Sequence, residues 1–505
     1  MSLAIVHTRA QDGVHAPPVR VEVDLANGLP GISIVGLPEA AVKESKDRVR
    51  AAIKNAHFEF PARRITVSLA PADLPKEGGR FDLPIALGIL AASGQIPADE
   101  LNQYECLGEL SLAGDLRPVR GMLPVAMAAS QEGRALILPE ANAAEAALIT
   151  DADIRPARHL LDVCQHLAGG GESLPRYEGA PVAEQPDYPF DLSEVRGQPH
   201  ARRALEIAAA GSHHLLMVGP PGTGKTMLAT RMATILPPMS EAEALESAAV
   251  QSISQQGFDV KRWRQRVVRH PHHTASGVAL VGGGSNPRPG EISLAHHGIL
   301  FLDELTEFDR RVLEVLREPL ETGQITISRA ARQADFPAKF QFVAAMNPCP
   351  QGYDCDLRNN CHCTPEQQRR HRARISAPLL DRIDIQVEVP KLPKEALRGD
   401  EPPGETSEVV RERVLNARLR QMDRCGKTNA EMNNKEIQQH CKLDDKTLAL
   451  LETAMERFRL SARAYHRILK VSRSIADLDG SASIETQHLT EALNYRAMDR
   501  WQSMA

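Results

Sequence analysis

Residues 219–226 read Gly-Pro-Pro-Gly-Thr-Gly-Lys-Thr. The apolar run His214–Val218 precedes this stretch, and residues 227–233, which favour a helix, follow it. A glycine-rich loop between a strand and a helix is typical of a phosphate-binding loop. Its glycines let backbone N–H groups point at phosphate oxygens, and the helix N-terminus adds positive partial charge. The stretch therefore predicts an α/β nucleotide-binding core.

Two residues of this loop have expected roles in binding a nucleoside triphosphate. Lys225 would reach the β- and γ-phosphates, and the Thr226 hydroxyl would hold Mg²⁺. A chance glycine-rich turn is the alternative, but the flanking strand and helix favour the phosphate-binding interpretation. The residues expected to contact ATP along the loop are Gly219, Pro220, Pro221, Gly222, Thr223, Gly224, Lys225, Thr226 and Met227.

A second motif, residues 298–305, reads Gly-Ile-Leu-Phe-Leu-Asp-Glu-Leu. Its apolar residues predict a buried parallel strand, and α/β sheets bind ligands at the carboxyl ends of such strands. Asp303 would hold Mg²⁺ through water, and Glu304 would be the general base that acts on the attacking water. A buried strand that ends in solvated acids is the alternative, but the phosphate-binding loop earlier in the chain favours the catalytic interpretation.

Four further polar residues are candidates for the same chemistry. The run Phe-Gln-Phe-Val-Ala-Ala-Met predicts a strand that ends at Asn347, whose amide would orient the attacking water or would simply form an Asn-Pro turn. Arg382, within Leu-Leu-Asp-Arg-Ile-Asp, would either pair with a neighbouring aspartate or act in trans on the γ-phosphate held by another subunit. Arg463 or Arg467 would reach the nucleotide from a helical lid or lie on a solvated helix face.

Composition limits the class of protein. A chain of 505 residues with 42% hydrophobic residues is expected to form about three globular domains. The formal net charge of −5 means that any nucleic-acid contact would come from local basic surface. The apolar runs fall far short of a membrane helix, and the N-terminus lacks the pattern of a secretory signal. With eight cysteines and no such signal, we expect a cytoplasmic protein without membrane contacts.

The order of patterns along the chain predicts an α/β protein with an N-terminal α+β domain, a central P-loop α/β domain with inserts and a C-terminal helical lid. Glycine and proline mark the linker after the first domain, and a proline-rich loop precedes the helical region. The predicted boundaries are 1–167 for the first domain, 168–187 for the linker, 188–390 for the ATPase core and 391–505 for the lid.

Taken in chain order, these motifs resemble those of AAA+ ATPases of the magnesium-chelatase type. Residues 271–276 (Pro-His-His-Thr-Ala-Ser), 289–296 and 346–350 (Met-Asn-Pro-Cys-Pro) are similar to the ComM (YifB-like) family of bacterial proteins. This resemblance extends over all 505 residues.

The resemblance implies roles that the residues alone leave open. Asn347 would be sensor 1, Arg382 the arginine finger and Arg463 sensor 2. Residues 192–198 resemble the segment that packs on adenine, so Gln198 joins the expected ATP contacts. The family is linked to hexameric rings and to DNA branch migration during natural transformation. We therefore expect a homo-oligomer, and single-stranded or branched DNA as its partner.

The N-terminal region looks like a Lon-protease-type domain over residues 75–86 and 108–121. Proteases of this type need a serine nucleophile after the glycine-rich turn and a lysine further along the chain. Here the turn continues Arg80-Phe-Asp82, and residues 121–124 read Gly-Met-Leu-Pro. Both halves of the catalytic pair are missing, so we expect an inactive domain that serves as a ring-forming or DNA-contacting platform.

Two segments are candidates for DNA contact. In related AAA+ helicases an insert and a hairpin before sensor 1 project into the pore of the ring, and residues 270–289 and 328–338 correspond to them by resemblance. Cations and backbone N–H groups suffice to bind phosphates in a pore, although basic clusters are also compatible with a solvated face. The expected pore contacts are His272, His273, Arg288, Arg329 and Arg332.

Four cysteines occur close together, and they are Cys349, Cys355, Cys361 and Cys363. They are candidate ligands of a structural Zn²⁺, or free thiols in an insertion loop. Their C-x5-C-x5-C-x-C spacing departs from the compact C-x2–4-C pairs of ordinary zinc sites. Members of the resembled family often carry a further cysteine where this chain has Gln351, which leaves the ligand set open.

These observations favour a ring-forming ATP-driven DNA translocase or helicase that promotes branch migration. The alternative is a chelatase-type motor that remodels a protein partner, although such motor subunits are expected to lack the Lon-like region. A nucleotide-gated scaffold is a third hypothesis. The intact set of Lys225, Asp303, Glu304 and Arg382 argues against a purely structural protein.

Overall fold

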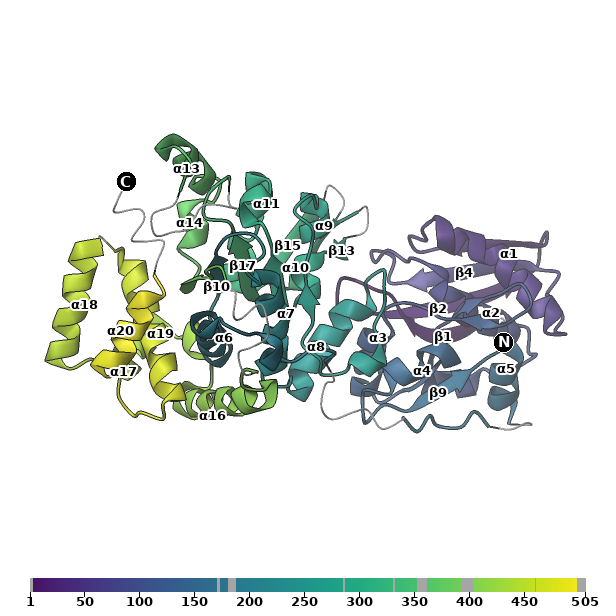
Figure 1. Ribbon diagram of the computed structural model, residues 1–505. Helices are drawn as coiled ribbons and strands as arrows, with labels where there is room; N and C mark the ends of the chain where they lie inside the picture. Colours follow the sequence, from purple (N-terminus) through teal and green to yellow (C-terminus); the bar gives the residue numbers. More distant parts are fainter. Residues whose placement is uncertain are drawn as a thin grey trace. The chain divides into compact units, whose positions relative to one another are not determined.

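The computed structural model describes residues 3–169, 173–179, 188–284, 287–329, 332–351, 361–392, 403–458 and 460–496. The chain forms two compact units of mixed α/β structure (Figure 1). Unit 1 comprises Met1–Glu184 and Leu245–Trp263, and unit 2 comprises Gln185–Ala244 and Arg264–Ala505. Within the described ranges, every helix is too short or too polar to cross a lipid bilayer.

Unit 1 is built on a seven-stranded mixed sheet in the order β3-β4-β2-β1-β5-β8-β9. Its central helix, α2 (Asp82–Ala92), is buried along its whole length, which explains its almost entirely apolar sequence. The carboxylate of Asp82 is also buried and accepts hydrogen bonds from the side chains of Arg48 and Ser45. The strands are β1 (Leu3–Arg9), β2 (Pro18–Ala26), β3 (Gly31–Val35), β4 (Arg64–Ala70), β5 (Tyr104–Cys106), β8 (Ala135–Pro139) and β9 (Ile154–Ala157). The other helices are α1 (Ala40–Asn55), α3 (Met122–Gln131), α4 (Glu140–Ala146) and α5 (Leu160–Ala168).

Unit 1 also contains a segment from the middle of the sequence, Leu245–Trp263. Helix α8 (Glu241–Ser252) runs from unit 2 into this segment. The backbone N–H of Gly121 donates to the Ser252 carbonyl at 3.1 Å, and Ile253 is buried. The chain therefore passes between the two units at three places, near residues 184, 244 and 263.

Unit 2 contains a five-stranded sheet in the order β11-β14-β17-β10-β18, and all its strands are parallel. Its central strands are continuous apolar runs, as expected for strands covered on both faces. This parallel sheet agrees with the α/β class predicted from the sequence. The strands are β10 (Leu215–Val218), β11 (Val268–Arg269), β14 (Ile299–Leu302), β17 (Gln341–Met346) and β18 (Ile385–Glu388).

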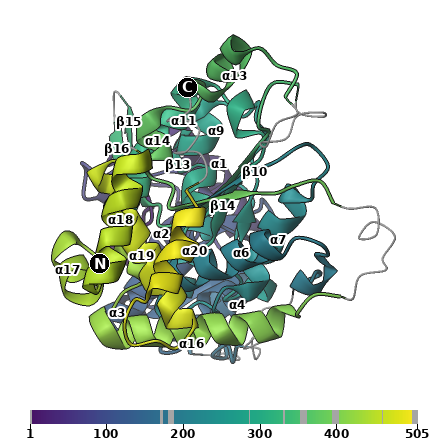
Figure 2. The same cartoon turned by 60° about the vertical axis from the view of Figure 1, so that its left-hand side comes forward.

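The C-terminal part of unit 2 is helical. Figure 2 shows α16 along the lower edge of the unit, where it packs against α6 and α7. Helix α19 packs against α6, α16 and α20. The bounds are α6 (Pro199–Gly211), α7 (Lys225–Ile235), α16 (Ser407–Cys425), α17 (Asn434–His440), α18 (Asp445–Phe458), α19 (Ala462–Leu478) and α20 (Thr486–Asn494). The role of these helices as a lid stays a prediction.

Shorter elements surround the parallel sheet. Hairpins β12–β13 and β15–β16 are antiparallel. The bounds are α9 (Gly277–Val281), β12 (Gly282–Gly283), β13 (Arg288–Pro289), α10 (Glu291–Leu294), α11 (Arg310–Val315), α12 (Arg317–Thr322), β15 (Gln324–Arg329), β16 (Arg332–Pro337), α13 (Pro365–Arg372) and α14 (Ala377–Leu380).

A buried polar network joins the parallel sheet to α19. His213 Nδ1 lies 3.4 Å from Asp384 Oδ2, and His213 Nε2 lies 2.7 Å from Ser474 Oγ. Asp384 also pairs with Arg467 of α19. Burial alone would raise the pKa of Asp384, but Arg467 and His213 lower it below its usual range. The carboxylate therefore stays charged and ties the start of β18 to the helical region.

The same region gives stability a pH dependence. Burial lowers the pKa of His214 to about 4, and its Nδ1 accepts a hydrogen bond from the Phe342 N–H at 3.1 Å. The imidazole is thus neutral in the folded protein, whereas unfolding releases it to its ordinary pKa of about 6.5. Between these two values the unfolded chain binds more protons, so stability falls as the pH drops from about 6.5 to about 4.

We predict that His214→Asn reduces this loss of stability, because an asparagine Oδ1 can accept the same hydrogen bond but does not titrate. Urea unfolding followed by circular dichroism at pH 7.0, 5.5 and 4.5 would measure the effect. The midpoint should fall less steeply with pH in the variant than in the wild type. Equal slopes for the two proteins would contradict the assignment.

Candidate nucleotide site

The loop after β10 has a backbone that only glycine accommodates easily. Gly222 and Gly224 have φ angles of 75° and 90°, in the left-handed region. A Cβ atom on Gly219 would lie 2.1 Å from the Val389 carbonyl oxygen. Any larger residue at this position would therefore displace either the loop or the end of β18.

Lys225, the first residue of α7, points back into this loop. Its Nζ donates to the carbonyl oxygens of Gly219 and Pro220 at 2.7 and 2.8 Å, and lies 3.4 Å from Asn347 Oδ1. Burial lowers the pKa of Lys225, whereas the charge of Asp303 raises it. The ammonium group is thus held at the centre of the loop, where a bound phosphate would compete with the carbonyls for it.

The acidic pair lies beside this cation at the carboxyl end of β14. The Thr226 hydroxyl donates to Asp303 Oδ2 at 2.5 Å. Glu304 has a φ of 51°, a left-handed conformation that costs a non-glycine residue about 1–2 kcal/mol. Lys225, Thr226, Asp303 and Glu304 therefore meet at one edge of the sheet, together with Asn347 at the end of β17.

Two other predicted ATP contacts border the loop. Gln198 is buried, and its Nε2 donates to the Pro390 carbonyl at 2.8 Å, one residue after the carbonyl that limits Gly219. The Met227 Cε lies 3.5 Å from the position that a Cβ on Gly224 would take. Both residues are next to the loop, but the Gln198 amide is already engaged by the backbone.

His273, one of the predicted DNA contacts, lies against the candidate general base, and its contact with DNA stays a prediction. Its Nδ1 is 3.2 Å from Glu304 Oε2, and its ring centroid is 4.1 Å from that of His272. Nδ1 of His272 contacts the Thr274 hydroxyl at 2.9 Å. The contact depends on the parallel pairing of β14 with β11, the strand that precedes the His pair. Sequence periodicity does not give this strand order.

The two predicted arginines lie at the opposite edge of the sheet. Arg382 precedes the amino end of β18, and its guanidinium pairs with Glu321 and donates to the Pro378 carbonyl. Arg463 of α19 lies 3.8 Å from Asp381 and is 68% exposed. Both arginines line a cavity of about 260 Å³. Other residues that line this cavity include His214, His466, Arg467 and Lys470.

The contacts distinguish Arg463 from Arg467, the two arginines of α19 between which the sequence did not decide. Arg467 pairs with the buried carboxylate of Asp384, so it belongs to the polar network of the core. Arg463 makes a long contact of 3.8 Å with Asp381, and most of its side chain is exposed. Arg463 is therefore the better placed of the two to meet a ligand.

The three arginines among the expected DNA contacts lie on two hairpins. Strands β15 and β16 pair antiparallel up to Arg329 opposite Arg332, which confirms the predicted hairpin. The side chains of these two arginines lie outside the described part of the structure. Arg288 is exposed on β13, where its backbone faces Gly283 of β12. Contact of these residues with DNA stays a prediction.

The sequence matches family models along most of its length. The model described as magnesium chelatase, subunit ChlI, matches residues 191–397. The model described as subunit ChlI of Mg-chelatase matches residues 21–142, and the model of the ChlI C-terminal part matches residues 404–496.

Similar proteins cover the whole chain. Competence protein ComM of Haemophilus influenzae is 55% identical over 504 residues, which cover 99% of this chain and 98% of that protein. Protein YifB of Escherichia coli is 52% identical over 500 residues, with the same coverage of 99% and 98%. The magnesium-chelatase 38 kDa subunit of Rhodobacter capsulatus is 24% identical over 347 residues, which cover 62% of this chain and 88% of that protein.

The contact between His273 and Glu304 leads to a prediction. Removal of the imidazole in His273→Ala should leave the Glu304 carboxylate poorly oriented, and should lower kcat for triphosphate hydrolysis about tenfold with little change in nucleotide affinity. His272→Ala is the matched control, because His272 does not contact the carboxylate in the structure. Steady-state hydrolysis assays would measure kcat, and nucleotide titration would measure the affinity. Equal kcat values for the two variants would show that the contact has no catalytic importance.

Proposed function

Since the chain belongs to the ComM/YifB family of magnesium-chelatase-like proteins, we propose that it is a ring-forming AAA+ ATPase that moves along DNA and promotes branch migration. The observation that carries the ATPase proposal is the convergence of Lys225, Thr226 and Asp303 beside a glycine-rich loop. The name of the ComM relative, a competence protein, supports DNA as the substrate on which the motor acts.

The residues at the loop fit ATP and Mg²⁺. Lys225 would exchange its carbonyl partners for the β- and γ-phosphates, and the glycine-rich backbone would supply N–H donors. The hydroxyl of Thr226 and the carboxylate of Asp303 are oxygen ligands of the kind that Mg²⁺ prefers. The metal, when bound, would neutralise charge on the phosphates. Glu304 would accept a proton from the attacking water, and the Asn347 amide would orient that water.

The position of the arginines supports hydrolysis at subunit interfaces. Strands β10 and β18 have four residues each, so the two edges of the sheet are roughly 13 Å apart. Arg382 lies at the amino edge, whereas the phosphate loop lies at the carboxyl edge. We infer that Arg382, and Arg463 beside it, act on the nucleotide of a neighbouring copy. Contacts of this head-to-tail kind close into rings, for which six subunits is the family expectation.

The remaining parts have proposed supporting roles. The hairpins that carry Arg288, Arg329 and Arg332 would face DNA phosphates in the pore of the ring. The N-terminal unit would be an inactive Lon-like platform. In agreement with a structural role, Asp82 at the glycine-rich turn is buried and bound by Arg48.

A chelatase-type motor that remodels a protein partner is the second candidate. It is favoured by the magnesium-chelatase models, which match three separate ranges, including residues 21–142 of the N-terminal region. The two candidates share the ATP site and differ in the substrate that stimulates hydrolysis.

We predict that Glu304→Gln binds ATP with wild-type affinity but hydrolyses it at least about a hundredfold more slowly, because the amide cannot accept the proton. The wild-type rate should rise severalfold with single-stranded or forked DNA, and the protein should exchange strands on a four-way junction. Titration with a fluorescent nucleotide measures the ATP affinity, and phosphate release measures the hydrolysis rate. Gel electrophoresis of four-way junctions measures strand exchange. If the protein does not bind DNA and DNA does not change its hydrolysis rate, the remodelling motor would be favoured.

Subunit mixing tests whether both arginines act in trans. Arg382→Ala and Lys225→Ala should each be inactive, and their equimolar mixture should recover up to roughly a quarter of the wild-type rate, because some interfaces pair an intact loop with an intact arginine. The double variant Arg382→Ala/Arg463→Ala, mixed with Lys225→Ala, should recover as much as the single variant. A mixture that recovers only with the single variant would place Arg463 over its own nucleotide. Full activity of the wild type as a monomer would overturn the interface model.

A further inference from the structure

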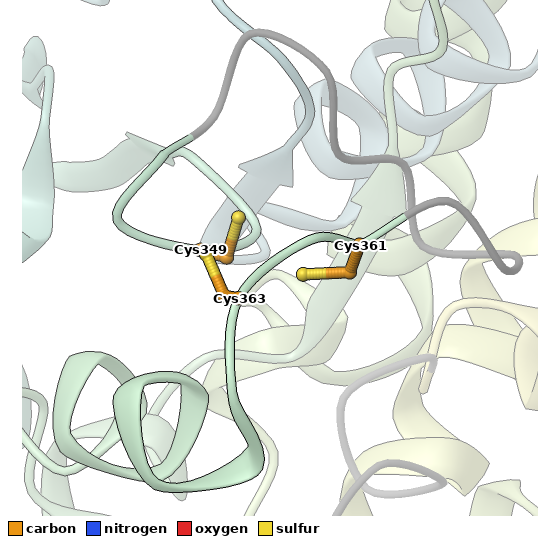
Figure 3. A group of neighbouring side chains, drawn as sticks. All are labelled: Cys349, Cys361 and Cys363. Carbon is orange, nitrogen blue, oxygen red and sulfur yellow. The ribbon is translucent and has the colours of Figure 1, made fainter.

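Three cysteines converge beside the nucleotide site of unit 2. Cys349 follows β17, and Cys361 and Cys363 precede α13. Their Sγ atoms all lie within 4.8 Å of one another. Figure 3 shows Cys349 beside Cys363, with the thiol of Cys361 directed toward them. Cys349 and Cys363 are buried, and Cys361 is half-buried, so the cluster is largely shielded from solvent.

The geometry and chemistry of this cluster fit a thiolate-bound metal ion. A tetrahedral site with Zn–S bonds of about 2.3 Å places its sulfur atoms about 3.8 Å apart, so the cluster needs to contract by about 1 Å at most. Thiolates are soft ligands that select zinc over Mg²⁺ or Ca²⁺.

The cluster connects elements that carry the proposed catalytic residues. Cys349 lies two residues after Asn347, and His371 Nε2 of α13 lies 3.0 Å from the Asn347 carbonyl oxygen. Just after α13, Arg374 donates to the Thr306 carbonyl at 2.9 Å, close to Glu304 in the sequence. A metal ion at the cluster would therefore fix α13 against the ends of both β14 and β17.

We propose that Cys349, Cys361 and Cys363 bind one Zn²⁺, which fixes the position of α13 beside Asn347. The three thiolates would supply three of the four ligands of a tetrahedral ion. Cys355, included in the set predicted from the sequence, lies outside the described residues. The cluster is separate from the oxygen ligands proposed for Mg²⁺, because it contains only sulfur donors.

The test is the metal content of the full-length protein, purified without chelators and measured by inductively coupled plasma mass spectrometry. We expect about one zinc per chain, and a loss of most of it in Cys349→Ser and in Cys363→Ser. Cys425→Ser is the matched control. Cys425 is a half-buried cysteine in α16 whose thiol contacts the backbone carbonyls of Gln421 and Lys427. This measurement uses neither ATP nor DNA, so its outcome is independent of the proposed ATPase.

A second measurement uses the wild-type protein, so it tests the proposal even if the serine variants fail to fold. Titration of the folded wild type with an organomercurial should release zinc in step with the loss of thiols, as followed with a metallochromic dye. Amide hydrogen exchange over residues 365–372 should then rise at least about tenfold, with α18 unchanged.

Several results would overturn the proposal. These are a wild-type protein that stays zinc-free after incubation with zinc and dialysis, a serine variant that keeps its zinc, and a disulfide within the cluster in non-reducing mass spectrometry. Iron with a visible absorption band would identify an iron–sulfur cluster instead. Unchanged exchange in α13 after zinc release would overturn its positioning role.

Discussion

The common direction of the five strands in unit 2 is the constraint on which the rest of the site depends. Because the strands are parallel, their carboxyl ends lie along one edge and their amino ends along the other. Phosphate-binding and acidic residues follow the carboxyl ends, and Arg382 precedes an amino end. A single subunit therefore holds both halves of the proposed reaction, but on opposite sides of its own sheet, where they cannot meet.

The two cationic side chains proposed to bind nucleotide already have partners within the chain. Lys225 is bound by loop carbonyls, and Arg382 is bound by Glu321 and the Pro378 carbonyl. Charged groups at this depth require such partners, since an unpaired buried cation is costly. Binding of a nucleotide is thus an exchange of partners rather than a gain of new ones. The phosphates need to be better acceptors than the carbonyls and the carboxylate that they replace.

Local sequence patterns were sufficient to predict the parts of the structure that local physics determines. The glycine-rich loop and the apolar strand before Asp303 follow from residues close together in the chain, whereas the β15–β16 hairpin was expected from the family resemblance. The contact of His273 with Glu304, and the pairing of Arg382 with Glu321, join residues that are far apart in sequence. Such contacts depend on strand order, which periodicity does not encode.

The assignment of Leu245–Trp263 to unit 1 was also beyond the sequence pattern, and it has a mechanical consequence. Two domains joined by one flexible linker can turn freely about it, and one proteolytic cut separates them. Here the polypeptide crosses between the units near residues 184, 244 and 263. A cut at any one crossing gives two fragments that still share at least one unit, whose internal packing holds them together. From the phosphate loop, the backbone therefore leads directly through α7 and α8 into the N-terminal unit.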